Sequence, residues 1–160
     1  MFDFSKIGLL PTHIDGFRPA ATDAQIAELE QHCGYPLPEN YKLILRHYNG
    51  CCPTAKYFDV IDEDGIPGEW TLYDFYTLDQ DKESPANIWW TIKHYGADMG
   101  PNTIPFAEDR ADQIYYFKWV NDAPQVWMIG YDYDVEAEDV SEPGVFVLDS
   151  FDTLLNSLYA

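Results

Sequence analysis

The residues of this sequence with the most potential for chemistry are carboxylates, concentrated in its C-terminal two-thirds. Residues 1–56 carry six acids against five bases, whereas residues 57–160 carry 22 acids against four bases. The acids of the second part form four groups in stretches with the composition of turns or loops. The groups are Asp62, Glu63 and Asp64; Asp79, Asp81 and Glu83; Glu108, Asp109 and Asp112; and Asp132, Asp134, Glu136, Glu138, Asp139 and Glu142. Such carboxylates could bind basic side chains of a partner, coordinate a metal ion or simply keep the protein soluble.

The most regular of these groups alternates acids with apolar residues from Asp132 to Glu138. In an extended backbone this alternation would turn all four acids to one side, where they could hold a cation. The EF-hand pattern, however, requires glycine at its sixth position and a bidentate carboxylate at its twelfth, where this sequence has Ala137 and Pro143. We therefore predict no metal site and no cofactor.

Histidine and cysteine residues are the other candidates for metal binding or catalysis. Zinc motifs place four such ligands at characteristic spacings. Those spacings are not found in the set His32, Cys33, His47, Cys51 and Cys52. A cysteine nucleophile paired with His47 or His94 is conceivable, but the nearby charges are mostly acidic and would not lower a thiol pKa. Carboxylate pairs can always be picked from 28 acids, so we predict no enzyme and keep an acidic or metal-dependent hydrolase as the minor alternative.

The overall charge of the sequence restricts the class of partner. The formal net charge is −19 and the pI is about 4.1, whereas proteins that bind nucleic acids or anionic membranes need a surplus of Lys and Arg. We therefore predict neither ligand and favour a basic protein, whose approach a strongly negative surface accelerates. The same charge opposes self-association, so a monomer or a weak homo-oligomer is expected.

Cysteine usage and the absence of targeting signals predict a cytoplasmic protein. Cys33, Cys51 and Cys52 are odd in number and two of them are adjacent, which does not suit the disulfide framework of a secreted protein. The first residues lack a basic segment followed by an apolar run. No stretch approaches the roughly 18 apolar residues that span a bilayer.

Two short helices are expected in the near-neutral first part of the chain. A capping box predicts a helix over Thr22–Cys33, which Gly34 ends in a left-handed conformation. Pro38 suits the first position of a second helix, where its missing N–H is no loss, and Asn49-Gly50 ends that helix. Together they form a helical hairpin.

A third helix is expected after Ser84-Pro85, with Gly96 at its end. Trp89 lies on its apolar stripe, whereas Trp90 is about 100° further round the helix and points elsewhere. An exposed Trp90 beside acidic loops would be a good anchor for a partner, because interface hot spots favour aromatic residues. Partial burial under a neighbouring loop is the alternative.

The remaining chain alternates in the way that is typical of strands, and it closes with an amphipathic helix after Ser150. The predicted strands are Tyr57–Ile61, Trp70–Leu78, Thr103–Phe106, Gln113–Trp119, Gln125–Tyr131 and Val145–Leu148. Turns are expected at Asp64-Gly65 and Pro67-Gly68. The pattern predicts an α+β fold: one domain in which a largely antiparallel or mixed sheet of about six strands packs with about four helices.

Three short motifs follow one another along this chain. They are Leu37-Pro38-x-x-Tyr41-Lys42 with Asn49-Gly50; Ile104-Pro105-Phe106-Ala107-Glu108-Asp109; and Ser150-Phe151 with Leu154, Leu155 and Leu158. In this order they resemble the SUKH superfamily, which includes fungal cell-wall-assembly regulators and bacterial toxin-immunity proteins. The chain departs from many relatives at Cys51-Cys52-Pro53 and at residues 110–112, where those have glycine-rich segments. The resemblance spans residues 22–160, so we expect one SUKH-like domain over residues 1–160, with residues 1–21 as an N-terminal extension.

The resemblance implies an intracellular binding module without enzymatic activity, frequently one that neutralises a toxin by direct binding. The motif residues themselves have structural roles: Tyr41 and Tyr48 would face the core and Gly50 would release the chain toward the sheet. With the charge, this favours an immunity protein that binds a basic toxin domain, such as a nuclease, through the acidic surface. A regulatory interaction module of the cell-wall-assembly type is the alternative.

Overall fold

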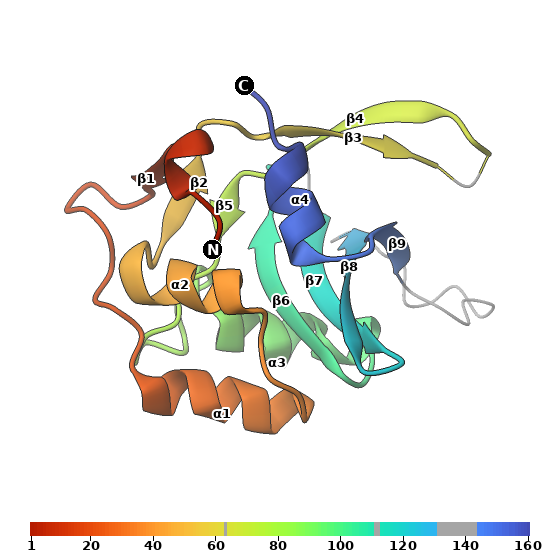
Figure 1. The fold of residues 1–160 in the computed structure, drawn as a ribbon. Helices are drawn as coiled ribbons and strands as arrows, with labels where there is room; N and C mark the ends of the chain where they lie inside the picture. Colours follow the sequence, from red (N-terminus) through yellow and green to blue (C-terminus); the bar gives the residue numbers. More distant parts are fainter. Residues whose placement is uncertain (63, 111–112, 131–143) are drawn as a thin grey trace.

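The structure is a computed structural model that describes residues 1–62, 64–110, 113–130 and 144–160. Its elements in chain order are η1 (Phe4–Lys6), β1 (Leu9–Pro11), α1 (Asp23–Cys33), α2 (Glu39–His47), β2 (Cys51–Pro53), β3 (Tyr57–Ile61), β4 (Pro67–Thr71), β5 (Asp74–Phe75), α3 (Ile88–Met99), β6 (Thr103–Glu108), β7 (Gln113–Val120), β8 (Ala123–Gly130), β9 (Val145–Leu148) and α4 (Phe151–Ser157) (Figure 1). This arrangement confirms the predicted α+β class with antiparallel strands.

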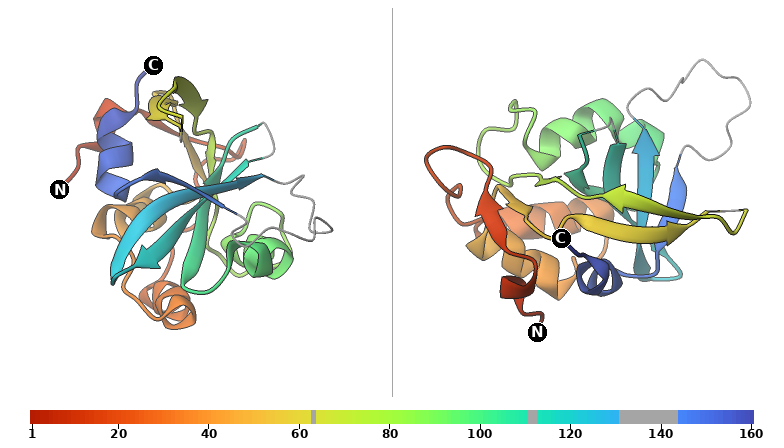
Figure 2. Two further views of the ribbon diagram at one scale, coloured as in Figure 1. Left: turned by 90° about the vertical axis from the view of Figure 1, so that its right-hand side faces the viewer. Right: turned by 90° about the horizontal axis from the view of Figure 1, so that it is seen from above.

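The strands of the described chain form three sheets, where the sequence predicted one. The largest has the order β5-β6-β7-β8-β9, and the pairs β1-β2 and β3-β4 form two-stranded sheets. Figure 2 shows α2 and α4 on one side of the five-stranded sheet and α3 on the other. The β3–β4 hairpin extends beyond the body of the sheet on the side of β9 (Figures 1 and 2). The predicted extension, residues 1–21, contributes β1 and the buried Ile7.

The helical hairpin largely agrees with the prediction. The Thr22 side chain accepts a hydrogen bond from the Gln25 N–H, and the Gln25 side chain accepts one from the Thr22 N–H, so the capping box is complete. Gly34 ends α1 with a φ of 82°. Pro38, however, is the N-cap of α2, one position before the predicted one, because its ψ of 137° is extended and not helical.

The segment predicted as one strand from Trp70 to Leu78 is instead two strands in different sheets. β4 pairs with β3, and β5 pairs with β6. Leu72, which lies between them, is fully buried where the chain passes from the hairpin to the main sheet. Pro67-Gly68, predicted as a turn, begins β4; proline is tolerated there because it opens the strand of a two-stranded sheet.

The third helix begins later than predicted, because a tertiary contact sets its start. Its N-cap is Asn87, whose side-chain oxygen accepts a hydrogen bond from the Trp89 N–H at 2.8 Å. The Asn87 amide donates to the Asp79 backbone carbonyl at 3.2 Å, which ties the helix start to the segment after β5. The helix also continues past Gly96 to Met99. Ser84-Pro85 therefore lies in the loop before α3.

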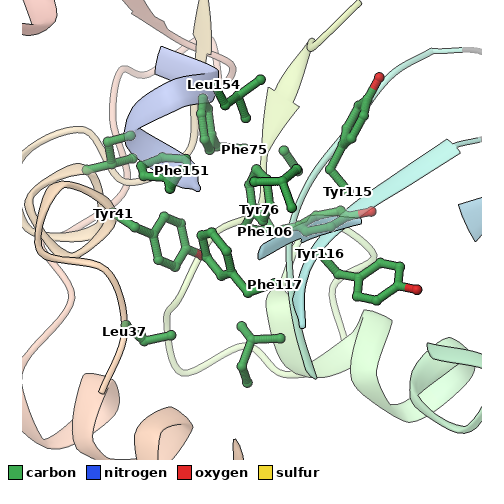
Figure 3. Packing of buried hydrophobic residues seen from close by; sticks show 14 of the residues in the cluster. Leu37, Tyr41, Phe75, Tyr76, Phe106, Tyr115, Tyr116, Phe117, Phe151 and Leu154 are labelled. Carbon is green, nitrogen blue, oxygen red and sulfur yellow. The ribbon is translucent and has the colours of Figure 1, made fainter. Parts of the chain in front are cut away.

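Tyr41 of α2 is at the centre of the core, as Figure 3 shows. Its ring meets those of Phe106, Phe117 and Phe151 edge-on, at centroid distances of 6.0, 5.1 and 5.7 Å. Such geometry is favourable for aromatic rings beyond the area that they bury. Tyr48, which was also expected to face the core, is half-buried and packs against two aromatic rings of the N-terminal segment.

Asn49 of the first motif is a buried hydrogen-bonding hub. Its side-chain amide donates to the carbonyls of Pro19 at 2.8 Å and Leu78 at 2.9 Å, and its side-chain oxygen accepts from the Leu78 N–H at 3.0 Å. These bonds join the turn after α2 to the segment before α1 and to the segment after β5. The motif residue thus holds together three parts of the chain that are distant in sequence.

We predict that Gly50→Ala destabilises the protein more than Gly34→Ala. Both glycines have positive φ, 75° and 82°, so each alanine costs about 1–2 kcal/mol of backbone strain. A Cβ at Gly50 would also lie 2.9 Å from the Arg18 Cγ and 3.1 Å from the Thr77 Cγ2, whereas Gly34 faces open space. In urea unfolding, Gly50→Ala should lower the free energy of unfolding by about 1 kcal/mol or more beyond the effect of Gly34→Ala. Equal losses would contradict the close packing at Gly50.

Candidate interaction surface

Eight of the grouped acids lie outside the described residues. They are Glu63, Asp112, Asp132, Asp134, Glu136, Glu138, Asp139 and Glu142. The predicted face of alternating acids belongs to this set and remains a prediction.

Asp62 and Asp64 are exposed in the turn at the tip of the β3–β4 hairpin. The Asp62 Oδ1 accepts hydrogen bonds from the backbone N–H groups of Asp64 at 2.9 Å and Ile66 at 2.8 Å. This side chain therefore stabilises the turn in the manner of an Asx turn. Both carboxylates are carried on a hairpin that extends from the body of the protein (Figure 1).

Asp79 has a structural role, whereas Asp81 is exposed. The Asp79 carboxylate accepts hydrogen bonds from the Arg18 Nε at 3.4 Å, the Asn87 side-chain amide at 3.1 Å and the Asp81 N–H at 2.9 Å. It is largely shielded from solvent. Asp79 therefore helps to hold the loop before α3, and Asp81 is the member of the pair that is open to a partner.

Glu108 and Asp109 lie where β6 ends, and neither is a freely exposed carboxylate. Glu108 accepts a hydrogen bond from the Tyr76 hydroxyl at 3.1 Å and is half-buried. Asp109 is only 5% exposed, and its Oδ1 accepts from the Gln113 N–H at 3.1 Å. Glu108 therefore joins β6 to Tyr76, which follows β5, and Asp109 joins the end of β6 to the start of β7.

Trp90 is half-buried on α3. Its ring stacks on that of His94 at a centroid distance of 3.9 Å, and the Nδ1 of His94 lies 2.8 Å from the Trp90 carbonyl oxygen. Trp89 packs against the core, with the Lys82 ammonium 4.9 Å from its ring centroid. Trp90 is thus partly accessible, but its ring is engaged within its own helix.

Two further acids, not singled out from the sequence, face each other across the hairpin. Asp59 of β3 is paired in register with Glu69 of β4, and both are exposed. The Tyr159 hydroxyl lies 2.8 Å from the Asp59 Oδ1 and 2.7 Å from the Glu69 Oε2. These two carboxylates, Glu69 first, raise the pKa of Tyr159 because its hydroxyl donates to them. The alternation of residues along β3 could have indicated that Asp59 is exposed. Its contact with Tyr159 could not be predicted in this way, because the two residues are far apart in sequence.

An apolar groove of about 630 Å³ lies between the hairpin and the β8–β9 end of the main sheet. We call it the hairpin groove. It is lined by Val60, Ile61, Asp62, Asp64, Trp70, Met128, Val145 and Phe146. No motif of the sequence predicted this groove, although an isoleucine at the end of a strand, next to acids, is a weak signal of an exposed apolar site.

The three cysteines are free thiols in the described structure. Cys33 and Cys51 are buried, and burial raises the pKa of the Cys51 and Cys52 thiols. A raised thiol pKa leaves little thiolate at neutral pH, which disfavours a nucleophile. Among the described residues, no group of three or more His, Cys, Asp and Glu side chains is placed to hold a metal ion.

The motif residues lie in the core or at its edge. Leu37, Tyr41, Asn49, Gly50, Pro105 and Phe106 are buried, and Pro38 is the half-buried cap of α2. Within the described ranges, none of the helices is both long and apolar enough to cross a membrane.

Comparison with known proteins agrees with this arrangement of motifs. Among curated proteins, no sequence matches the chain. The model of the SMI1 / KNR4 family (SUKH-1) matches residues 20–157, which cover α1 to α4 and the three motifs except Leu158. This chain therefore belongs to the SMI1 / KNR4 family (SUKH-1).

Proposed function

We propose that this protein is a non-enzymatic binding protein that neutralises a basic toxin domain by direct contact. The observation that carries the proposal is the charge: 22 acids against four bases in residues 57–160, in a chain of net charge −19. The family supports a protein-interaction role, since its members are generally non-catalytic and include immunity proteins and cell-wall regulators. We place this activity in the cytoplasm, where a toxin that attacks nucleic acid would act.

Electrostatics favour this class of partner. A domain that cleaves nucleic acid needs a basic surface to bind the phosphate backbone. A strongly negative protein is attracted to such a surface and competes with the substrate for it. On the hairpin, the exposed carboxylates of Asp62 and Asp64 are available for these contacts, whereas those of Asp59 and Glu69 already accept from the Tyr159 hydroxyl.

The proposal is tested with the product of the adjacent gene, when that gene encodes a toxin-like protein with a basic C-terminal domain. We expect co-expression of the two proteins to give a complex that survives size-exclusion chromatography at low salt, and cells that express the toxin domain to be rescued. The complex should weaken as NaCl rises, because screening reduces contacts between exposed charges.

The absence of both complex and rescue would contradict the immunity role. A matched control is a toxin domain from an unrelated gene pair with a similar net charge. Rescue from that domain as well would show charge neutralisation without recognition, which also contradicts the proposal.

A further inference from the structure

The hairpin groove brings together apolar side chains from three separate parts of the chain. Val60, Ile61 and Trp70 come from the hairpin, Met128 comes from β8, and Val145 and Phe146 come from β9. The groove is large enough to accommodate bulky side chains, since ligand pockets in proteins are typically about 300–1,000 Å³.

Three apolar side chains of the groove are unusually exposed for their type, whereas Val60 is buried. Ile61 is 72% exposed, Phe146 48% and Val145 39%. Ile66, in the turn at the tip of the same hairpin, is also exposed. Scattered apolar residues are normal on a protein surface, but exposed apolar residues gathered in one concave place mark an interaction site.

One wall of the groove is held in place before any partner arrives. At the base of the hairpin, Phe58 is fully buried and the Tyr115 hydroxyl donates to the Thr71 carbonyl at 2.7 Å. The backbone of Tyr57 exchanges two hydrogen bonds with that of Tyr159, at 3.0 and 2.8 Å. A preorganised wall reduces the conformational entropy that is lost on binding, so less of the interaction energy is needed to offset it.

The charge around the groove selects its occupant. Asp62 and Asp64 are part of its lining, and within the described chain none of the lining residues is Lys or Arg. A segment with Lys or Arg beside a bulky apolar side chain would bury that side chain while its cations contact the two carboxylates. An acidic apolar segment, or a second copy of this chain with its net charge of −19, would be repelled.

We propose that the hairpin groove binds a bulky apolar side chain of the basic partner protein, flanked by Lys or Arg residues that contact Asp62 and Asp64. This rests on the proposed function and deepens it: the groove supplies the anchor, and the wider acidic surface supplies attraction and orientation. Interfaces commonly divide in this way, with a few central apolar or aromatic contacts inside a polar rim.

The main test measures the affinity of the adjacent-gene toxin domain for groove variants by isothermal titration calorimetry. Ile61→Ser with Phe146→Ser changes no charge, and we expect about 30-fold weaker binding with an unchanged salt dependence. The control, Leu10→Ser with Ile14→Ser, removes two exposed apolar side chains that do not line the groove and should leave the affinity unchanged. Ile61→Ser alone, expected to weaken binding several-fold, serves if the double variant unfolds in circular dichroism.

A charge variant separates the two roles assigned to the groove. Asp64→Asn keeps the side-chain shape, and the hydrogen bond to the Asp62 Oδ1 uses the backbone of residue 64 and not its side chain. We expect several-fold weaker binding with a smaller salt dependence, because one contact between charges is lost. If the wild type, the apolar groove variant (Ile61→Ser with Phe146→Ser, or Ile61→Ser alone) and Asp64→Asn all bind the toxin domain with equal affinity, the groove is not the anchor. The proposed function would remain intact.

A peptide arm tests the groove independently of the toxin. The probe is acetyl-Lys-Arg-Phe-Lys-Arg-amide, and its control has Ser in place of Phe. In nitrogen-15 NMR spectra we expect the Phe peptide to shift the amides of Ile61, Met128 and Phe146 more than the Ser peptide does. Indistinguishable shifts from the two peptides would contradict an apolar anchor. Shifts at the groove without any toxin complex would support the groove and overturn the toxin as partner.

Discussion

Replacing Tyr41 by alanine should lower the free energy of unfolding by about 3–5 kcal/mol, the range for deleting a large aromatic side chain from a core. Tyr41 is fully buried, and its ring meets three other aromatic rings edge-on. Alanine would leave a cavity between α2, the main sheet and α4, because the surrounding rings belong to separate elements and cannot all move inward.

Tyr41→Phe, in contrast, should not destabilise the protein. The Tyr41 hydroxyl has no hydrogen-bond partner among the described residues, and burial raises the pKa of this group. An unpaired buried hydroxyl costs about 1–3 kcal/mol, so phenylalanine should leave stability unchanged or raise it by about 1 kcal/mol.

Urea unfolding, followed by tryptophan fluorescence, measures both Tyr41 variants. Tyr48→Ala is the control. Tyr48 is half-buried among peripheral rings, so this substitution should lower the free energy of unfolding by less than Tyr41→Ala does. A loss of more than 1 kcal/mol in Tyr41→Phe would show that the hydroxyl makes a stabilising contact, contrary to this account.

Replacing Asn49 by alanine should cost about 3–4 kcal/mol. Three hydrogen bonds are lost, each with a net value of about 1 kcal/mol, and the Leu78 N–H is left buried without this partner. The loss should also loosen the segments that the side chain joins, which are the chain before α1 and the segment after β5. Faster hydrogen exchange of the Leu78 amide is the specific signature.

An isosteric variant, Asn49→Asp, tests whether the two donated bonds matter. A carboxylate accepts from the Leu78 N–H but faces the carbonyl oxygens of Pro19 and Leu78, which repel it. The folded-state pKa of this carboxyl would be raised above its unfolded value. Stability relative to the wild type is then greatest below the unfolded pKa and falls as pH rises through the folded pKa.

Unfolding of the Asn49 variants is best compared at pH 4 and pH 7 against the control Asn156→Ala. Asn156 is exposed, and its amide donates to the Asp152 carbonyl, so its loss should cost about 0.5 kcal/mol. A deficit of Asn49→Asp that did not grow between pH 4 and pH 7 would show that the amide donors are dispensable.

These variants separate the residues that maintain the fold from those that we assign to binding. Tyr41, Asn49 and Gly50 lie in the core or at its edge and are not part of the β3–β4 hairpin. Substitutions there should act through stability, whereas Ile61 and Asp64 are exposed and should act on affinity alone. We therefore assign the family motif to the scaffold and expect recognition of a particular partner to depend on other residues.

The elements that were predicted well are those whose signals are local. The capping box of α1, the strand β3 and the cap of α4 at Ser150 depend on neighbouring residues. The start of α3 was predicted wrongly because Asn87 is chosen as its cap through a contact with Asp79, which no local pattern reveals. The division of residues 70–78 into two strands likewise depends on which sheet each part joins.

The α+β class, the family resemblance and the excess of acids in residues 57–160 could be predicted from the sequence, because composition, helix caps and strand alternation are properties of neighbouring residues. Which acids are exposed depends on the tertiary structure, which buries Asp109 and engages Asp79 while leaving Asp62 and Asp64 at the hairpin tip. It alone formed the hairpin groove, because Ile61, Met128 and Phe146 meet only when β3–β4 packs beside β8 and β9. Strand pairing joins residues at large sequence separation, and no local pattern carries that information.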